Sequence, residues 1–176
     1  KIIKMSKGLR GIEAGKTSIC TVGETESDLL YRGYNVTDLS QNCVFEEVCF
    51  LLLNGKLPNS LELKDFTKKI FLKRHIPKSL ISVLEKIPNE TNPMDVLRTT
   101  CSFLGNIEPE KSFDNQIKCA ERLLGILPSA LNYWYHFSHS RKRIVIENDS
   151  ESIAGHFLST LYGKNPSETE EKVMNV

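Results

Sequence analysis

The chain has 176 residues, the size of one domain that removes roughly two-thirds of the unfolded chain's surface from water. Hydrophobic residues make up 40% and charged residues 26%, a balance typical of globular proteins that excludes a disordered chain. The 23 Lys and Arg residues nearly balance the 22 Asp and Glu residues. The resulting net charge of +1 gives no electrostatic basis for binding nucleic acid or an anionic membrane.

The five cysteines are scattered without a C-x-x-C pair or a metal-like spacing, at Cys20, Cys43, Cys49, Cys101 and Cys119. We expect reduced thiols that are mostly buried, and therefore a cytoplasmic protein, because an exposed unpaired thiol is a liability where disulfides form. No apolar run has the length of a membrane-spanning helix, and the first residues lack the apolar core of a secretory signal.

Two β-rich runs lie near the N-terminus. They cover residues 17–22 and 29–34, and five polar or charged residues from Glu24 to Asp28 separate them. This pattern predicts a small β hairpin or ribbon.

Beyond Thr37 the apolar residues change to a helical period. Residues 45–53 place them at i, i+3, i+4, i+7 and i+8, which is one face of a helix. Gly55 and Pro58 are expected to end this helix, since glycine closes helices and proline cannot continue them.

Ser60 is expected to cap the next helix, which ends by Pro77, and residues 80–87 form a further short helix. Four lysines lie on the first of these helices. We interpret them as a solvated helix face, with contact to a phosphate as the alternative: Lys64, Lys68, Lys69 and Lys73.

Asn92 followed by Pro93 is a helix-start signal, and the pattern predicts a helix that Gly105 closes. A long helix with a wide apolar stripe then covers residues 113–137. Pro128 lies inside it, and we expect a kink or break there because proline removes one backbone hydrogen bond.

Residues 138–149 are polar and basic and indicate a loop. A helix over residues 154–161 ends at Gly163, and Asn165 with Pro166 starts another that has an acidic first turn. From the residues alone, the sequence predicts a mainly α domain with a small N-terminal β ribbon and without internal repeats.

Histidines are the first candidates for acid–base chemistry near neutral pH. His75 is expected at a helix C-terminus, where it needs no catalytic explanation. His136 and His139 have a spacing that could hold a metal, but no third ligand is in reach, so we favour packing or end-capping. His156, on an apolar helix, is interpreted as a buried, hydrogen-bonded core or interface histidine.

Other catalytic signatures are missing: neither a Gly-x-Ser-x-Gly elbow nor a Walker loop is present. An aromatic group could line a ligand pocket, although core or subunit interface is the preferred interpretation: Tyr133, Trp134, Tyr135 and Phe137.

Several long segments, in this order, resemble the N-terminal portion of the citrate synthase family, most closely its 2-methylcitrate synthases. They are GLRGIEAGKTSICTVGETESDLLYRGYNVTDL, FEEVCFLLLNGKLPN, NPMDVLRT, SFLGNIEPE, LNYWYHFSHS and SIAGHFLSTLYGKNPSE. The YRGY motif and the helix that ends in GKLP are shared across the wider family.

The resemblance implies that residues 1–176 are the N-terminal part of a large helical domain in a longer polypeptide. Lys1 and an incomplete apolar face on the last helix also favour a piece of a longer chain. Family members condense propionyl-CoA or acetyl-CoA with oxaloacetate, giving 2-methylcitrate or citrate plus CoA. Acyl-CoA is a substrate, so no cofactor is implied. The catalytic histidines and aspartate lie C-terminal to this region, and the chain alone is expected to be inactive.

One site residue follows from the resemblance. Arg10, in Gly8-Leu-Arg-Gly11, matches a family segment whose arginine approaches a CoA phosphate, and a guanidinium suits that contact. An exposed arginine in a glycine-rich arm is the alternative.

The resemblance also implies a homodimer, with residues 93–104 and 113–137 as interface helices and Trp134 as the central aromatic residue, unless Pro128 turns it toward the protomer's own core. Relatives often have histidine where this chain has Asn92, but asparagine caps a helix well.

A competing hypothesis makes the chain a non-catalytic helical scaffold or a degenerate relative that only dimerises. A downstream Glu-His-Glu motif and a Gly-Pro-x-His-Gly motif would distinguish a synthase from such a scaffold.

Overall fold

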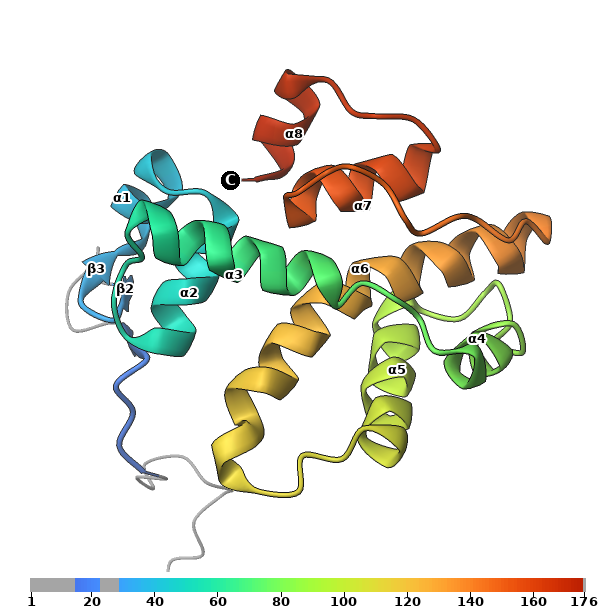
Figure 1. The fold of residues 1–176 in the computed structure, drawn as a ribbon, viewed down its shortest axis with the longest axis horizontal. Helices are drawn as coiled ribbons and strands as arrows, with labels where there is room; N and C mark the ends of the chain where they lie inside the picture. Colours follow the sequence, from blue (N-terminus) through green and yellow to red (C-terminus); the bar gives the residue numbers. More distant parts are fainter. Residues whose placement is uncertain (1–14, 23–28, 176) are drawn as a thin grey trace, which may run out of the picture.

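The structure is a computed structural model that describes residues 15–22 and 29–175 (Figure 1). Short strands come first and helices follow, so the mainly α fold with a small β ribbon is confirmed. The strands are β1 (Cys20–Val22), β2 (Leu29–Tyr31) and β3 (Tyr34–Asn35). The helices are α1 (Val36–Asn42), α2 (Phe45–Asn54), α3 (Ser60–Leu72), α4 (Lys78–Leu84), α5 (Pro93–Ile107), the 3₁₀ turn η1 (Phe113–Asn115), α6 (Gln116–Ser140), α7 (Ile153–Tyr162) and α8 (Glu168–Met174).

The β ribbon has three antiparallel strands in the order β1-β2-β3, where the sequence indicated two runs. The second run is divided by a turn at Arg32 and Gly33, which have φ angles of 52° and 91°. Two positive φ angles match the turn that best fits the twist of a hairpin. Arg32 also donates to the carbonyl oxygen of Leu52 at 2.8 Å, which attaches the ribbon to α2.

Helix α6 runs through the middle of the molecule and contacts α3, α4, α5 and α7 (Figure 1). It is continuous across Pro128. The ribbon changes direction partway along, between its yellow and its orange parts (Figure 1). Of the two expected outcomes at this proline, the structure therefore has a kink and no break.

The core lies where α4, α5 and the second half of α6 meet. Its buried residues are Ile76, Leu80, Leu84, Val96, Leu104, Ile126, Ala130, Tyr133, Trp134 and Ile146. Trp134 is only 2% exposed, and its indole N–H donates to the carbonyl oxygen of Ile87 at 3.3 Å. The Tyr133 hydroxyl donates to Glu85 at 2.7 Å, so both large aromatic residues satisfy their polar atoms inside the protomer.

The predicted helix starts lie at or within one residue of the observed ones where a side chain caps the helix. Asn92 accepts the N–H of Met94 at 2.9 Å, as expected. The expected cap at Ser60 is wrong by one residue, because Asn59 accepts two N–H groups there. Gly105 does not end α5, which continues to Ile107, since one glycine costs a helix only about 1 kcal/mol.

The last helices differ slightly from their predicted bounds. The long helix starts at Gln116 after a 3₁₀ turn and extends to Ser140. Helix α8 begins at Glu168, because Ser167 accepts the N–H of Glu170, so residues 165–166 precede the helix.

Helices α3 and α6 cross so closely that only glycine fits at the crossing. A Cβ atom added to Gly125 would lie 2.8 Å from the carbonyl oxygen of Ile70 and 3.0 Å from the carbonyl carbon of Lys73. Both neighbours are backbone atoms, so a side chain here would push the helices apart.

We predict that Gly125→Ala destabilises the protein by about 1–3 kcal/mol, because the two helices must separate to make room for the methyl group. Gly105→Ala is the matched control. Its Cβ would meet no atom within 4 Å, and replacing a helical glycine should stabilise by about 0.5–1 kcal/mol. Urea unfolding of the two variants measures both effects, and an equal change in both would contradict the close crossing.

Candidate functional site

The one site residue that the resemblance supplied, Arg10, lies outside the described residues. Its contact with an acyl-CoA phosphate therefore stays a prediction. The described residues offer other candidates, which are the histidines, an arginine cluster and the outer face of α5 and α6.

His156 is a buried structural histidine, as the sequence indicated. It is 1% exposed, its Nε2 lies 2.8 Å from the Ser129 hydroxyl, and its Nδ1 lies 2.9 Å from the side-chain nitrogen of Asn148. Burial, and then the nearby charge of Arg74, lower its pKa from 6.5 to about 3. Ser129 and His156 have the separation of a nucleophile and its base, but no substrate reaches them because both are buried.

The remaining histidines also have structural environments. His136 Nε2 lies 2.9 Å from the carbonyl oxygen of Leu161, and His139 Nδ1 lies 2.9 Å from that of Tyr135. A ring nitrogen that faces a carbonyl oxygen carries the proton and cannot bind a metal. His75 is exposed just after α3. Across residues 15–22 and 29–175, no group of three or more metal-ligating side chains is positioned to hold an ion.

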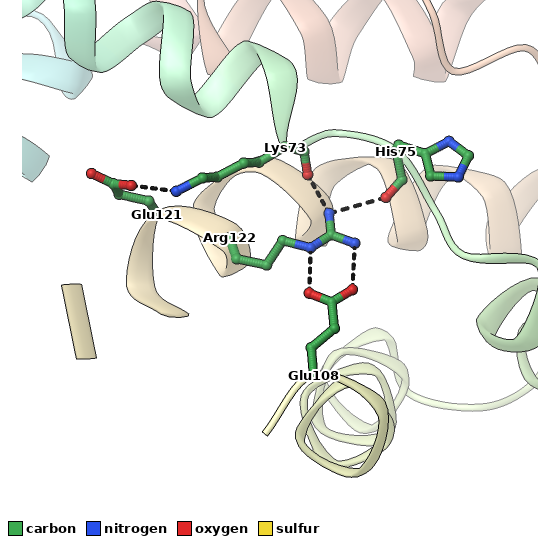
Figure 2. Close-up of polar contacts among 5 residues, drawn as sticks. All are labelled: Lys73, His75, Glu108, Glu121 and Arg122. Carbon is green, nitrogen blue, oxygen red and sulfur yellow. Dashed lines mark hydrogen bonds and ion pairs between the residues drawn. The ribbon is translucent and has the colours of Figure 1, made fainter. Parts of the chain in front are cut away.

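A cluster of polar contacts, the Arg122 cluster, joins three helices. It consists of Lys73, His75, Glu108, Glu121 and Arg122 (Figure 2). Arg122 donates twice to Glu108, at 2.8 and 3.0 Å, and also to the carbonyl oxygens of Lys73 and His75. The Arg122 guanidinium lowers the pKa of Glu108. Lys73 pairs with Glu121, so this lysine does not belong to the solvated face that the sequence indicated.

The Arg122 cluster borders a depression of about 700 Å³ between the C-terminal end of α5 and the start of α6. Arg122 and Glu108 satisfy each other, which leaves neither of them free as an acid or base. The cluster is therefore suited to holding the α5–α6 corner against the end of α3.

A second depression of about 790 Å³ follows the outer face of α3. Its lining includes Lys64 and Lys68 as well as Asp149 and Glu151. Charges of both signs do not form an anion site, which agrees with the interpretation of the two lysines as solvated.

The outer face of α5 and the start of α6 expose large apolar side chains. Around the α5–α6 corner, Phe113 is 80% exposed, and Ile107 and Ile117 are 41% and 39% exposed. Met94, 68% exposed, lies at the other end of α5, on the side opposite its buried residues. Trp134 does not belong to this outer face. Of the two outcomes expected for Trp134, the structure has the second: its side chain is 2% exposed and packs into the protomer's own core.

All five cysteines are unpaired. None is fully buried, however, and Cys101 on α5 is exposed, so the expectation of mostly buried thiols is wrong. Within the part of the chain that the structure describes, every helix is too short or too polar to cross a membrane.

Sequence reasoning missed the two arginines that organise the polar interior. Arg74 is 6% exposed and donates to the backbone carbonyls of residues 150–152, which lie 76 to 78 positions away. Arg122 binds backbone atoms 47 and 49 positions away. In the sequence, the only feature that marks either arginine is a positive charge next to the apolar residues of a helix.

The sequence of this chain matches proteins of one family. A sequence model described as citrate synthase, C-terminal domain, matches residues 8–176. A 2-methylcitrate synthase of Shewanella oneidensis is 50% identical over 169 residues, 96% of this chain and 45% of the relative. A citrate/2-methylcitrate synthase of Bacillus subtilis is 31% identical over 97% of this chain and 46% of the relative.

The fold is that of a solved citrate synthase from Thermoplasma acidophilum, a ternary complex with carboxymethyl coenzyme A and oxaloacetate. The TM-score is 0.85 at 23% identity, over 98% of this chain and 46% of that chain. The chain thus spans about half the length of the relatives it matches. It belongs to the citrate synthase family.

Proposed function

We propose that this chain is the N-terminal half of a 2-methylcitrate synthase, which condenses propionyl-CoA with oxaloacetate to give 2-methylcitrate and CoA. The observation that carries the proposal is the 50% identity to the Shewanella enzyme along 96% of this chain. Such an enzyme acts in propionate metabolism.

Citrate formation from acetyl-CoA, a step of the tricarboxylic acid cycle, is the second candidate. The relative named citrate/2-methylcitrate synthase favours it, since that name covers both products. The two acyl donors differ by one methylene, which a hydrophobic pocket discriminates by only about 1–3 kcal/mol. The unpaired cysteines are compatible with a reducing cytoplasmic compartment for either enzyme.

We predict that the complete protein releases CoA from propionyl-CoA in the presence of oxaloacetate and that residues 1–176 alone do not. The family's acid–base residues lie outside this chain, and their loss alone costs roughly 10²–10⁴-fold in rate. A thiol-release assay with propionyl-CoA and acetyl-CoA in parallel also gives the donor preference. An inactive complete protein would support the scaffold alternative, whereas activity of residues 1–176 would contradict the placement of catalysis elsewhere.

We predict that Arg10→Ala in the complete enzyme raises the KM for acyl-CoA by about tenfold, since a charge-assisted contact to phosphate is worth roughly 1.5–3 kcal/mol. The KM for oxaloacetate should change little. Lys16→Ala removes an exposed charge from the same N-terminal region and serves as the control. Unchanged acyl-CoA kinetics at low salt would assign Arg10 to the solvated surface.

The homodimer is proposed through α5 and the start of α6, which both expose large apolar side chains. Exposed apolar side chains mark an interface where they form a contiguous patch of more than a few hundred Å². Phe113, with Ile107 and Ile117 at the α5–α6 corner, replaces Trp134 as the expected contact.

We predict that Phe113→Asp weakens self-association of the complete protein by at least about tenfold, because a charge at an apolar contact costs about 1.4 kcal/mol or more. Sedimentation equilibrium over a hundredfold concentration range measures it. Val145→Asp alters an equally exposed apolar side chain outside this face and should have no effect. Trp134→Ala should instead lower the free energy of unfolding by about 3–5 kcal/mol. A monomeric parent, or equal effects of the two aspartates, would contradict this interface.

A further inference from the structure

Four residues from different parts of the fold form the His156 site. His156 lies on α7, Ser129 on α6, Asn148 in the segment that precedes α7, and Arg74 just after α3. Both Ser129 and His156 are shielded from solvent, at 0% and 1% exposure. The site is therefore a point at which residues 146–152 and α7 are held against the rest of the domain.

Asn148 fixes the orientation of the imidazole. Its side-chain oxygen accepts the N–H of Ser150 at 3.1 Å, and its side-chain nitrogen donates to the carbonyl oxygen of Ile146 at 3.3 Å. The same nitrogen faces His156 Nδ1, which must accept. The proton therefore resides on Nε2, which donates to Ser129.

A protonated imidazole does not fit these partners. Its second N–H, at Nδ1, would point at the N–H of Asn148, and no acceptor would face it. Rotating the Asn148 amide by 180° would supply an oxygen but would break its bonds to Ser150 and Ile146. A buried N–H without an acceptor is as costly as a lost hydrogen bond to a charged group.

The fixed charge that acts on the imidazole, Arg74, has the same sign as the proton would have. Arg74 donates to the carbonyl oxygens of residues 150–152, so it cannot move away without releasing that segment. Burial and Arg74 together lower the pKa of His156 to about 3.

Charged and titratable groups on the surrounding elements do not compensate. Glu46 on α2 is the nearest anion to Arg74, and it accepts the N–H of Ile153 at 2.6 Å. Glu171 on α8 accepts the hydroxyl of Ser152. On α6, His136 binds carbonyl oxygens at the far end of α7, and Ser129, its contact to His156, carries no charge.

We propose that His156 is a pH-sensitive switch for residues 146–152 and α7. The neutral imidazole holds this part of the chain on α3 and α6, and a proton on it releases the segment while the remaining helices stay folded.

The sign and size follow from linkage. The folded-state pKa lies below the ordinary value of 6.5, so the segment is fully held above pH 6.5 and loses hold as the pH falls toward about 3. Below pH 6.5 each further pH unit raises the opening equilibrium about tenfold, which gives about 30-fold between pH 7.5, where the imidazole of the open segment is neutral, and pH 5.0.

Hydrogen exchange of the complete protein, corrected for intrinsic rates, tests this at pH 7.5 and 5.0. Peptides covering residues 146–162 should lose about 30-fold in protection, and peptides of α5 should lose less than about threefold. Equal loss in all peptides would mean global unfolding, and no loss in residues 146–162 would mean no switch. Either result overturns the proposal.

Two variants separate the switch from simple weakening of the fold. His156→Gln removes the titrating group, and Asn148→Asp gives the protonated imidazole an acceptor while keeping one for the Ser150 N–H. Both should flatten the pH dependence, and Asn148→Asp should leave the segment more protected at pH 5.0 than the parent. The exposed His139→Gln is the control and should retain the parent's dependence. Retention of the full dependence in Asn148→Asp, or in a folded His156→Gln, overturns the proposal.

Discussion

The close crossing of α3 and α6 at Gly125 is the constraint on which the polar interior depends. One helical turn before Gly125 lie Glu121 and Arg122, and one turn after it lies Ser129. The backbone of α3 must approach α6 within contact of Gly125 for Lys73 to reach Glu121 and for Arg122 to reach two carbonyl oxygens. The same approach brings Arg74 to residues 150–152. A bulkier residue at position 125 would strain the Arg122 cluster and the contacts of Arg74 with residues 150–152 at once.

The kink in α6 divides this long helix into parts with different tasks. Before Pro128, the helix meets α3 and carries the Arg122 cluster. After it, the aromatic residues Tyr133 and Trp134 enter the core beside α4 and α5. A straight helix would carry its apolar stripe along a single line. The bent helix packs its first part against α3 and its second part into the core beside α4 and α5.

Local signals predicted much of the fold, and long-range contacts account for the errors. The Asn92 cap and the helix period over residues 45–53 depend on neighbours within a few positions, and both predictions are confirmed. Pro128 left two sides open for Trp134, and the choice between them depends on a bend whose direction tertiary packing decides. Arg122 and Arg74 could not be recognised as organising residues, because their partners are backbone carbonyl oxygens far away in the sequence. The expected acyl-CoA contact of Arg10 came only from the resemblance, and Arg10 lies outside the described residues.

Recognition of residues 150–152 through main-chain atoms has a consequence for sequence divergence. Arg74 donates to three backbone carbonyl oxygens, which every residue type carries. These hydrogen bonds do not depend on the side chain of Glu151. Substitutions can therefore accumulate at positions 150 and 151 while the path of the segment is preserved, whereas Ser152 also uses its hydroxyl, which binds Glu171 and caps α7. Arg74 itself has no such freedom, since lysine offers one cationic nitrogen in place of a planar fork. Related chains should thus vary at positions 150 and 151 while they retain the arginine.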